Sequence, residues 1–315
     1  MLNIVLEVII QVMNDVILQN SCPLCGSKNL RQVKKEINSL ASHKSPLVNA
    51  FDRTWVHLMQ CQECSFAFCQ EIPSHPDFFN QRYSVDYDPM LESQSDFKNV
   101  ILEDIFRLLG KYGKPNGKLL DVGSFAGVFL QAAKVHGFEV EGVELNSKMA
   151  RFSQEKLGLK VFNGKIHDFS AETKFDVITL IDVLEHLYRP QEIIEKCTGL
   201  LKPGGLLVIK VPNYMPQRFK QAIANKLGTN SLGIFDNFSH INQFSPRALD
   251  KACMLLGLSI EECAVARSEM WPGSTIKNKF RNMMRNIFYE LSRFITVVTG
   301  KNVGLNIIHI SRKPL

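Results

Sequence analysis

The chain has 315 residues, a length that suggests about two domains because a domain typically holds about 100–200 residues. Hydrophobic residues make up 45% of the chain and charged residues 22%, and this ordinary globular composition excludes a disordered, collagen-like or coiled-coil protein. The formal net charge is +6 at pH 7, and the excess lies at the C-terminal end, where residues 271–315 carry 8 basic side chains and 1 acidic one.

No apolar run reaches the roughly 18 residues that would indicate a membrane-spanning helix. The apolar segment of residues 1–19 lacks both the basic start and the small-residue cleavage site of a signal peptide. A cytoplasmic protein is therefore expected. Residues 1–95 carry 7 basic and 10 acidic side chains, and this balance argues against a nucleic-acid partner, which would select a basic patch.

Four of the 8 cysteines form two pairs, and 35 residues separate Cys22-Pro-Leu-Cys25 from Cys61-Gln-Glu-Cys64. Two such turns can place four thiolates in a tetrahedron around zinc. Disulfides are disfavoured because no export signal is visible. The spacing predicts structural Zn2+ in a ribbon module over residues 21–75, after an N-terminal extension of residues 1–20. A metal-free site is the alternative.

A polar and aromatic segment, residues 76–95, follows this module and contains Tyr83 and Tyr87. Such a segment can cover a cleft, or it can be a linker whose tyrosines pack on the next domain. Both interpretations are open. The periodicity of the sequence changes at Asp96, where we place the start of the second domain.

Residues 96–315 alternate between apolar runs and segments with helical spacing. Helices are predicted at residues 97–109, 127–136, 147–157, 190–201 and 246–256. Strands are predicted at residues 118–122, 138–144, 159–162, 175–181, 206–211, 258–266 and 304–311. This alternation predicts an α/β fold with a doubly wound parallel sheet, which binds ligands beyond the carboxyl ends of its strands.

The first predicted strand leads into a glycine-containing turn that begins at Asp121 and includes Gly123 and Gly127. The next strand ends at Glu144, whose carboxylate can accept hydrogen bonds from both hydroxyls of a ribose. Dinucleotide sites use a second glycine where Phe125 stands here. Asp121 would also repel a diphosphate and attract an ammonium group. A ribose with a cationic amino-acid tail describes S-adenosylmethionine.

These residues resemble the motifs of class I S-adenosylmethionine-dependent methyltransferases. Residues 119–127 (LLDVGSFAG) resemble the family's first motif, and Glu144 matches its ribose-binding acid. Residues 175–186 (FDVITLIDVLEH) resemble its fourth-strand motif, and residues 200–205 (LLKPGG) resemble the turn before its fifth strand. The resemblance implies a Rossmann-like seven-stranded sheet with strand order 3-2-1-4-5-7-6 and an antiparallel last strand.

The same resemblance implies which residues hold the cofactor. Asp168 is placed at the adenine, with a helix cap or turn residue as the alternative, and two residues after the fourth strand line the cleft. The implied set is Asp121, Gly123, Ser124, Gly127, Glu144, Leu145, Asp168, Ile181 and Asp182. A four-cysteine ribbon joined to this domain also resembles a subgroup that acts on sugars, nucleotide-sugars and other precursors of surface glycans.

Methylation of a hydroxyl requires removal of a proton, and a positioned general base accelerates such a step by roughly 10²–10⁴-fold. Histidine is the usual base near neutral pH. His186 and His240 both follow predicted strands on the ligand side and are our candidates. The alternatives are a structural histidine that shapes the cleft at position 186 and a loop histidine bonded to backbone at position 240.

An insertion at residues 271–300 contains a predicted basic amphipathic helix over residues 276–299. Such a helix can lie on an anionic membrane surface, where a lipid-linked substrate would be found. Its charge could instead attract the diphosphate of a nucleotide-sugar. The third interpretation is a helix that packs on the core or on a second subunit, and the oligomeric state is not predicted.

The leading hypothesis is an S-adenosylmethionine-dependent methyltransferase that acts on a small or lipid-linked acceptor. We expect the acceptor to be a hydroxyl of a sugar or nucleotide-sugar in glycan biosynthesis. The alternatives are C-methylation of a keto-sugar, methylation of RNA or protein, and a non-catalytic cofactor-binding module. A peripheral membrane location is compatible with the cytoplasmic expectation.

Overall fold

The computed structural model describes residues 16–37, 48, 55–74, 78, 91–113, 117–226, 240–271 and 273–315, and the structural statements below concern these residues. Residues 1–15 of the predicted N-terminal extension lie outside the described residues. The same is true of Tyr83 and Tyr87 in the predicted cleft cover.

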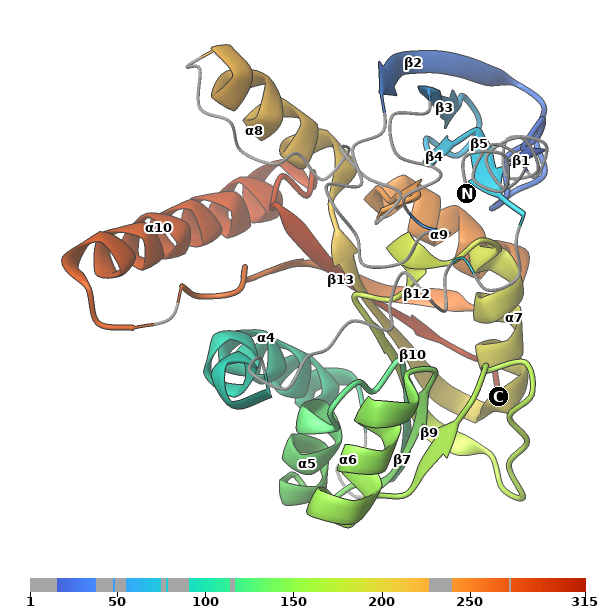
Figure 1. Ribbon diagram of the computed structural model, residues 1–315, viewed down its shortest axis with the longest axis vertical. Coiled ribbons are helices and arrows are strands. Elements are labelled where there is room, and N and C mark those ends of the chain that lie inside the picture. The colour runs from blue at the N-terminus through green and yellow to red at the C-terminus, as the bar shows by residue number, and fades with distance from the viewer. Residues whose placement is uncertain are drawn as a thin grey trace, which may run out of the picture.

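A seven-stranded sheet forms the centre of the C-terminal domain (Figure 1). Its order is β12-β13-β10-β9-β6-β7-β8, and β13 runs antiparallel to both of its neighbours, which confirms the predicted order and the antiparallel last strand. The strands are β6 (Lys118–Val122), β7 (Glu139–Glu144), β8 (Val161–Asn163), β9 (Phe175–Ile181), β10 (Leu201–Pro212), β12 (Ser259–Ala266) and β13 (Asn306–Arg312).

One strand begins earlier than its apolar run indicated. β10 starts at Leu201, which pairs with Phe175, and a register shift follows before pairing resumes at Leu206. The proline and glycines of residues 202–205 therefore form an irregular strand segment rather than a turn outside the sheet. Bulges of this kind accept residues that a regular ladder would reject.

Helices cover both faces of the sheet (Figure 1). Apolar residues of α4, α5 and α6 contribute to one core cluster, and those of α7 and α9 contribute to the other. The helices are α4 (Leu91–Tyr112), α5 (Val128–Val135), α6 (Ser147–Leu157), α7 (Pro190–Leu200), α8 (Tyr214–Lys226), α9 (Pro246–Leu255) and α10 (Ile276–Thr299), with a 3-10 turn η1 (Leu184–His186).

The cysteine pairs lie in small N-terminal sheets. β1 (Val16–Leu18) pairs with β5 (Glu71–Pro73). The second sheet has the order β11-β4-β3-β2, and it comprises β2 (Leu30–Ile37), β3 (Trp55–Cys61), β4 (Ala67–Cys69) and β11 (Asn242–Gln243). Because β11 comes from the C-terminal domain, the two parts of the chain are joined by backbone hydrogen bonds as well as by side-chain packing.

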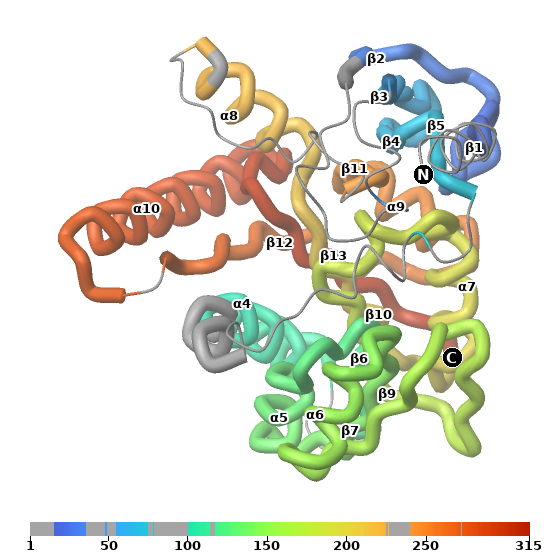
Figure 2. Tube along the Cα trace, in the orientation of Figure 1, coloured from blue at the N-terminus to red at the C-terminus, as the bar shows by residue number. Residues whose placement is uncertain are grey.

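α8 and α10 project from the same side of the body (Figures 1 and 2). α10 has the predicted bounds: Thr275 caps its first turn by accepting a hydrogen bond from the Asn278 N–H at 3.3 Å, and Gly300 ends it at φ +69°. Among the helices of the described residues, none is long and apolar enough to cross a membrane.

Candidate active site

The glycine turn after β6 is tightly packed against its surroundings. Gly123 has φ +80°, and a Cβ built there would lie 2.5 Å from Cγ2 of Val183. Gly127 has φ +78°, and its Cβ would lie 2.6 Å from Cδ1 of Leu159. Positive φ together with contacts this close requires glycine at both positions. The two glycines thus bring the turn against the residues that follow β9 and α6.

Glu144 is fixed by backbone groups at the end of β7. One carboxylate oxygen accepts from the N–H of Phe125 at 2.7 Å, and the other accepts from the N–H of Asn146 at 2.7 Å. Burial raises the pKa of Glu144, and the surrounding N–H groups oppose that shift. Each oxygen keeps a lone pair that can accept a ribose hydroxyl. The carboxylate therefore joins the glycine turn to a site suited to a ribose.

Two buried polar side chains lie beside this turn. Oδ1 of Asp121 accepts from the hydroxyl of Thr179 at 2.6 Å, which ties β6 to β9. The hydroxyl of Ser124 is buried and has no hydrogen-bond partner among the described residues. Because buried polar atoms are normally satisfied, the Ser124 hydroxyl fits a site that a bound ligand completes. Both observations are compatible with the predicted S-adenosylmethionine.

The remaining predicted cofactor residues lie at the same edge of the sheet or just beyond it. Leu145 follows β7 and is partly exposed. Ile181 ends β9. Asp168 is exposed in a turn after β8, where its N–H donates to the carbonyl of Lys165 at 3.0 Å. Asp168 therefore lies in a turn, and its contact with the adenine stays a prediction.

An ion pair that the motifs did not reveal lies directly after β9. Nζ of Lys210 is 2.6 Å and 2.7 Å from the two carboxylate oxygens of Asp182, which has φ +55°. Burial alone would lower the pKa of Lys210, but the carboxylate of Asp182, together with those of Glu185 and Glu269, holds that pKa above its usual value. A lysine inside the apolar run of β10 was the sequence signal for this contact.

Replacing the charged Lys210 side chain by an apolar one should therefore destabilise the protein. We expect Lys210→Met to lower the free energy of unfolding by about 3 kcal/mol, because the carboxylate of Asp182 is left largely desolvated without its partner. Chemical denaturation measures this loss. The double variant Lys210→Met with Asp182→Asn should recover part of it, and equal losses in the single and double variants would contradict the assignment.

The two candidate histidines come together. The rings of His186 and His240 are 4.7 Å apart between centroids, at 71° to one another. Glu185, which is buried, lies with them so that one ligand-type atom of each residue falls within 4.8 Å of the others. This cluster can pass or hold a proton, and its atom types could also hold a divalent cation. η1 supplies two of the three side chains.

Asn242 links the two segments that carry these histidines. Its amide donates to the carbonyl of Leu184 at 2.9 Å and to that of Leu187 at 2.5 Å. Gln243 donates to the carbonyl of His240 at 3.0 Å. β11 therefore holds the backbone of His240 in place, and we call this residue and Ile241 the histidine loop. β11 is also the edge strand of the cysteine-rich sheet.

The four predicted cysteine ligands do assemble. The Sγ atoms of Cys22 and Cys64 are 3.7 Å apart, and those of Cys25 and Cys61 are 3.6 Å apart. All four sulfurs lie within 4.8 Å of one another. With zinc–sulfur bonds of about 2.3 Å, a tetrahedral site needs sulfurs about 3.8 Å apart. The geometry fits the predicted zinc, which would join the two cysteine pairs.

This cluster supports the histidine loop through the shared sheet. The N–H of Cys69 donates to the carbonyl of Ile241 at 2.9 Å, and the ring of Phe66 packs 4.9 Å from that of Phe244. Arg247 donates to the carbonyl of Glu63 at 2.7 Å. The second cysteine pair, at the turn between β3 and β4, and the segment after His240 thus belong to one small sheet, an arrangement that the spacing of the cysteines could not predict.

Comparison with known proteins identifies the class that this fold and site define. Residues 94–262, more than half of the chain, match the family described as a methyltransferase domain. The chain belongs to this family and is a class I S-adenosylmethionine-dependent methyltransferase. The prediction of the enzyme class is therefore confirmed.

Individual relatives give the same class. The chain is 28% identical over 164 residues to the ubiquinone biosynthesis O-methyltransferase of Azoarcus sp. (strain BH72), covering 48% of this chain and 68% of that protein. It is 33% identical over 137 residues to the enzyme of the same name from Glaesserella parasuis, covering 39% and 58%. The match thus spans about three fifths of the second relative and slightly more than two thirds of the first.

One solved structure shows the fold. A chain from the complex between the Haloferax volcanii Trm112 methyltransferase activator and a methyltransferase aligns with a TM-score of 0.51 at 13% sequence identity. The alignment covers 72% of this chain and 96% of that chain. At this identity the likeness concerns the fold alone, and it agrees with the Rossmann-like sheet described above.

Proposed function

We propose that the enzyme methylates a hydroxyl of a sugar or nucleotide-sugar, either free or attached to lipid. The observation that carries the proposal is the pair His186 and His240 at the carboxyl edge of the sheet, beside the predicted cofactor turn. A hydroxyl acceptor has to lose a proton, and an imidazole can take it near neutral pH. The two relatives described above are named as O-methyltransferases, which supports oxygen as the acceptor atom.

S-adenosylmethionine supplies an electrophilic methyl group when it is bound. The residues that would hold it are the glycine turn at Gly123 and Gly127, the carboxylate of Glu144 and the hydroxyl of Ser124. Asp182 is held in position by Lys210 at the end of β9. This rigid edge limits the positions that an acceptor can take, and such positioning is a main source of rate enhancement in group transfer.

His240 is our choice for the general base. Asn242 bonds the segment after it to η1 and Gln243 donates to the backbone carbonyl of His240, so the backbone that carries the imidazole is held in place. Glu185 is buried within reach of both rings and can stabilise the imidazolium that forms after proton transfer. In this arrangement His186 orients His240 through ring contact, and the zinc ribbon holds the strand beside the loop.

Replacing His240 should reduce turnover while leaving cofactor binding unchanged. We expect His240→Ala to lower kcat by about 10²–10⁴-fold, with an unaltered dissociation constant for S-adenosylmethionine. His167→Ala, an exposed turn histidine, is the matched control and should keep full turnover. The measurement is transfer of a labelled methyl group to sugar, nucleotide-sugar and lipid-extract acceptors. Full turnover in His240→Ala would exclude this residue as the base.

A further inference from the structure

Apolar side chains on α10 face away from the protein body. We define the outer face of α10 as Ile276, Phe280, Met283, Ile287, Leu291 and Phe294, which recur at intervals of three and four residues. All six are exposed, and Ile276 and Phe294 have 88% and 66% of their surface accessible. Six large apolar residues on one stripe are more than scattered surface hydrophobics, and such a patch indicates an interaction site.

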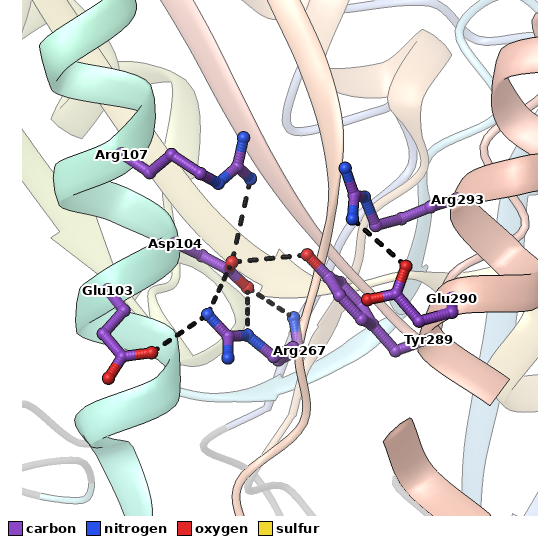
Figure 3. Close-up of polar contacts among 7 residues, drawn as sticks. All are labelled: Glu103, Asp104, Arg107, Arg267, Tyr289, Glu290 and Arg293. Carbon is purple, nitrogen blue, oxygen red and sulfur yellow. Dashed lines mark hydrogen bonds and ion pairs between the residues drawn. The ribbon is translucent and has the colours of Figure 1, made fainter. Parts of the chain in front are cut away.

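The opposite side of α10 is anchored to the body, so its outer face cannot turn inward. Tyr289 is buried and its hydroxyl donates to Asp104 of α4 at 3.3 Å (Figure 3). Arg267, at the end of β12, binds the same carboxylate through two guanidinium contacts of 3.0 and 3.1 Å. Asn282 exchanges hydrogen bonds with the backbone of Trp271 at 2.8 and 3.0 Å. These contacts fix the rotation of the helix about its axis.

α10 is basic overall, and two of its basic side chains border the outer face. α10 carries five basic residues and one acidic residue, Glu290. At about 100° per residue, Lys277 and Lys279 lie on the two opposite borders of the outer face, and both side chains are exposed. Arg281 and Arg285 stack on the ring of Trp271 at 4.7 and 5.4 Å. An apolar stripe bordered by lysines suits a surface of anionic lipid headgroups over acyl chains.

This charge disfavours a dimer in which the outer faces of two copies pack against each other. Two copies of α10 would bring the lysines at the borders of their apolar stripes toward one another, and like charges that meet across an interface cost affinity. An anionic lipid surface neutralises these charges instead.

α10 is also rooted at the active-site edge of the sheet. Ala266, the last residue of β12, pairs with Asn306, the first residue of β13, and Asn306 pairs with Pro212 at the carboxyl end of β10. The side chain of Asn213 donates to the carbonyls of Asn302 and Gly304 at 3.3 and 2.9 Å, which ties the segment after α10 to that end of β10. The segments that flank α10 therefore leave and rejoin this edge of the sheet, and the helix itself projects from the body with only its C-terminal end near β13 (Figure 1).

We propose that the outer face of α10 docks the enzyme on an anionic membrane surface. Docking brings the carboxyl edge of the sheet close to acceptors that are attached to lipid. The access to lipid-attached acceptors rests on the proposed function, whereas the docking itself depends only on α10. A lipid-attached acceptor would then reach the histidines from the headgroup layer without leaving the membrane.

The test is sedimentation of the full-length protein with phosphatidylcholine vesicles, with and without phosphatidylglycerol. We expect binding to the phosphatidylglycerol vesicles that weakens as salt is added. Phe280→Glu with Ile287→Glu should abolish it, and Lys277→Glu with Lys279→Glu should weaken it about tenfold or more. The matched control is Val135→Glu on α5, an apolar residue with 87% of its surface exposed that lies outside α10.

Binding of S-adenosylmethionine by calorimetry and the melting temperature serve as folding controls for every variant, and they separate this proposal from the proposed function. Wild-type protein that binds the cofactor but does not bind phosphatidylglycerol vesicles would overturn the docking proposal. So would equal binding by the Phe280→Glu/Ile287→Glu variant. A concentration-dependent dimer in light scattering that this variant dissociates, without vesicle binding, would assign the outer face to a second copy instead.

Discussion

Gly123→Ala is expected to abolish measurable binding of S-adenosylmethionine. The residue has φ +80°, a conformation that costs an L-residue about 1–2 kcal/mol. The new methyl group would also lie 2.5 Å from Val183, so the turn or the segment after β9 has to move. Because the N–H of the adjacent Phe125 binds Glu144, a displaced turn also displaces the predicted ribose-binding carboxylate. Calorimetric titration measures the effect.

Gly158 provides the matched control for this substitution. It ends α6 with φ +61°, and a Cβ there meets nothing within 4 Å. Gly158→Ala therefore carries backbone strain without a clash, and it should lower stability by about 1–2 kcal/mol with cofactor affinity unchanged. If Gly123→Ala bound the cofactor as well as Gly158→Ala does, the close approach at Gly123 would have no role in cofactor binding.

Cys61→Ser is expected to cause the largest loss of stability together with a loss of turnover. The substitution removes one of four sulfurs whose spacing fits zinc, and structural zinc sites contribute folding free energy directly. We expect the zinc content to fall and the free energy of unfolding to drop by several kcal/mol, about the scale of a lost structural metal. Because β4 pairs with β11 next to His240, kcat should fall as well.

Cys263→Ser is the appropriate comparison, since this half-buried cysteine in β12 lies outside the four-sulfur cluster. It should keep the metal and turnover of the wild type. Zinc is measured by elemental analysis, stability by thermal unfolding and turnover by methyl transfer. A Cys61→Ser protein with normal stability and normal turnover would show that the cluster does not support the active-site loop.

Much of the catalytic fold could be predicted from the sequence because its signals are local. Buried parallel strands such as β6 and β9 appear as short apolar runs, and helices between them have clear periodicity. Strand order followed from the family resemblance and is confirmed. The bounds of β10 were less accurate, because a bulge lets residues 202–205 enter the sheet despite their proline and glycines.

Tertiary contacts explain what the sequence could not predict. Lys210 interrupts an apolar strand, but only the fold brings it to Asp182, 28 residues away in the chain. The histidine pair was predicted one residue at a time, and its meeting depends on Asn242 joining two loops. For α10, an apolar stripe has the same periodicity whether it is buried or exposed. The structure was needed to show that the stripe of α10 faces outward.

The central claim, a cofactor site built on the glycine turn and Glu144, is tested most directly by calorimetric titration of zinc-loaded protein. S-adenosylmethionine and NAD are titrated separately into the wild type and Glu144→Ala. We expect one molecule of S-adenosylmethionine to bind per chain, Glu144→Ala to weaken this binding strongly, and NAD not to bind. Folded, zinc-loaded wild type that binds no S-adenosylmethionine, or a Glu144→Ala variant that binds it with unchanged affinity, would contradict this claim.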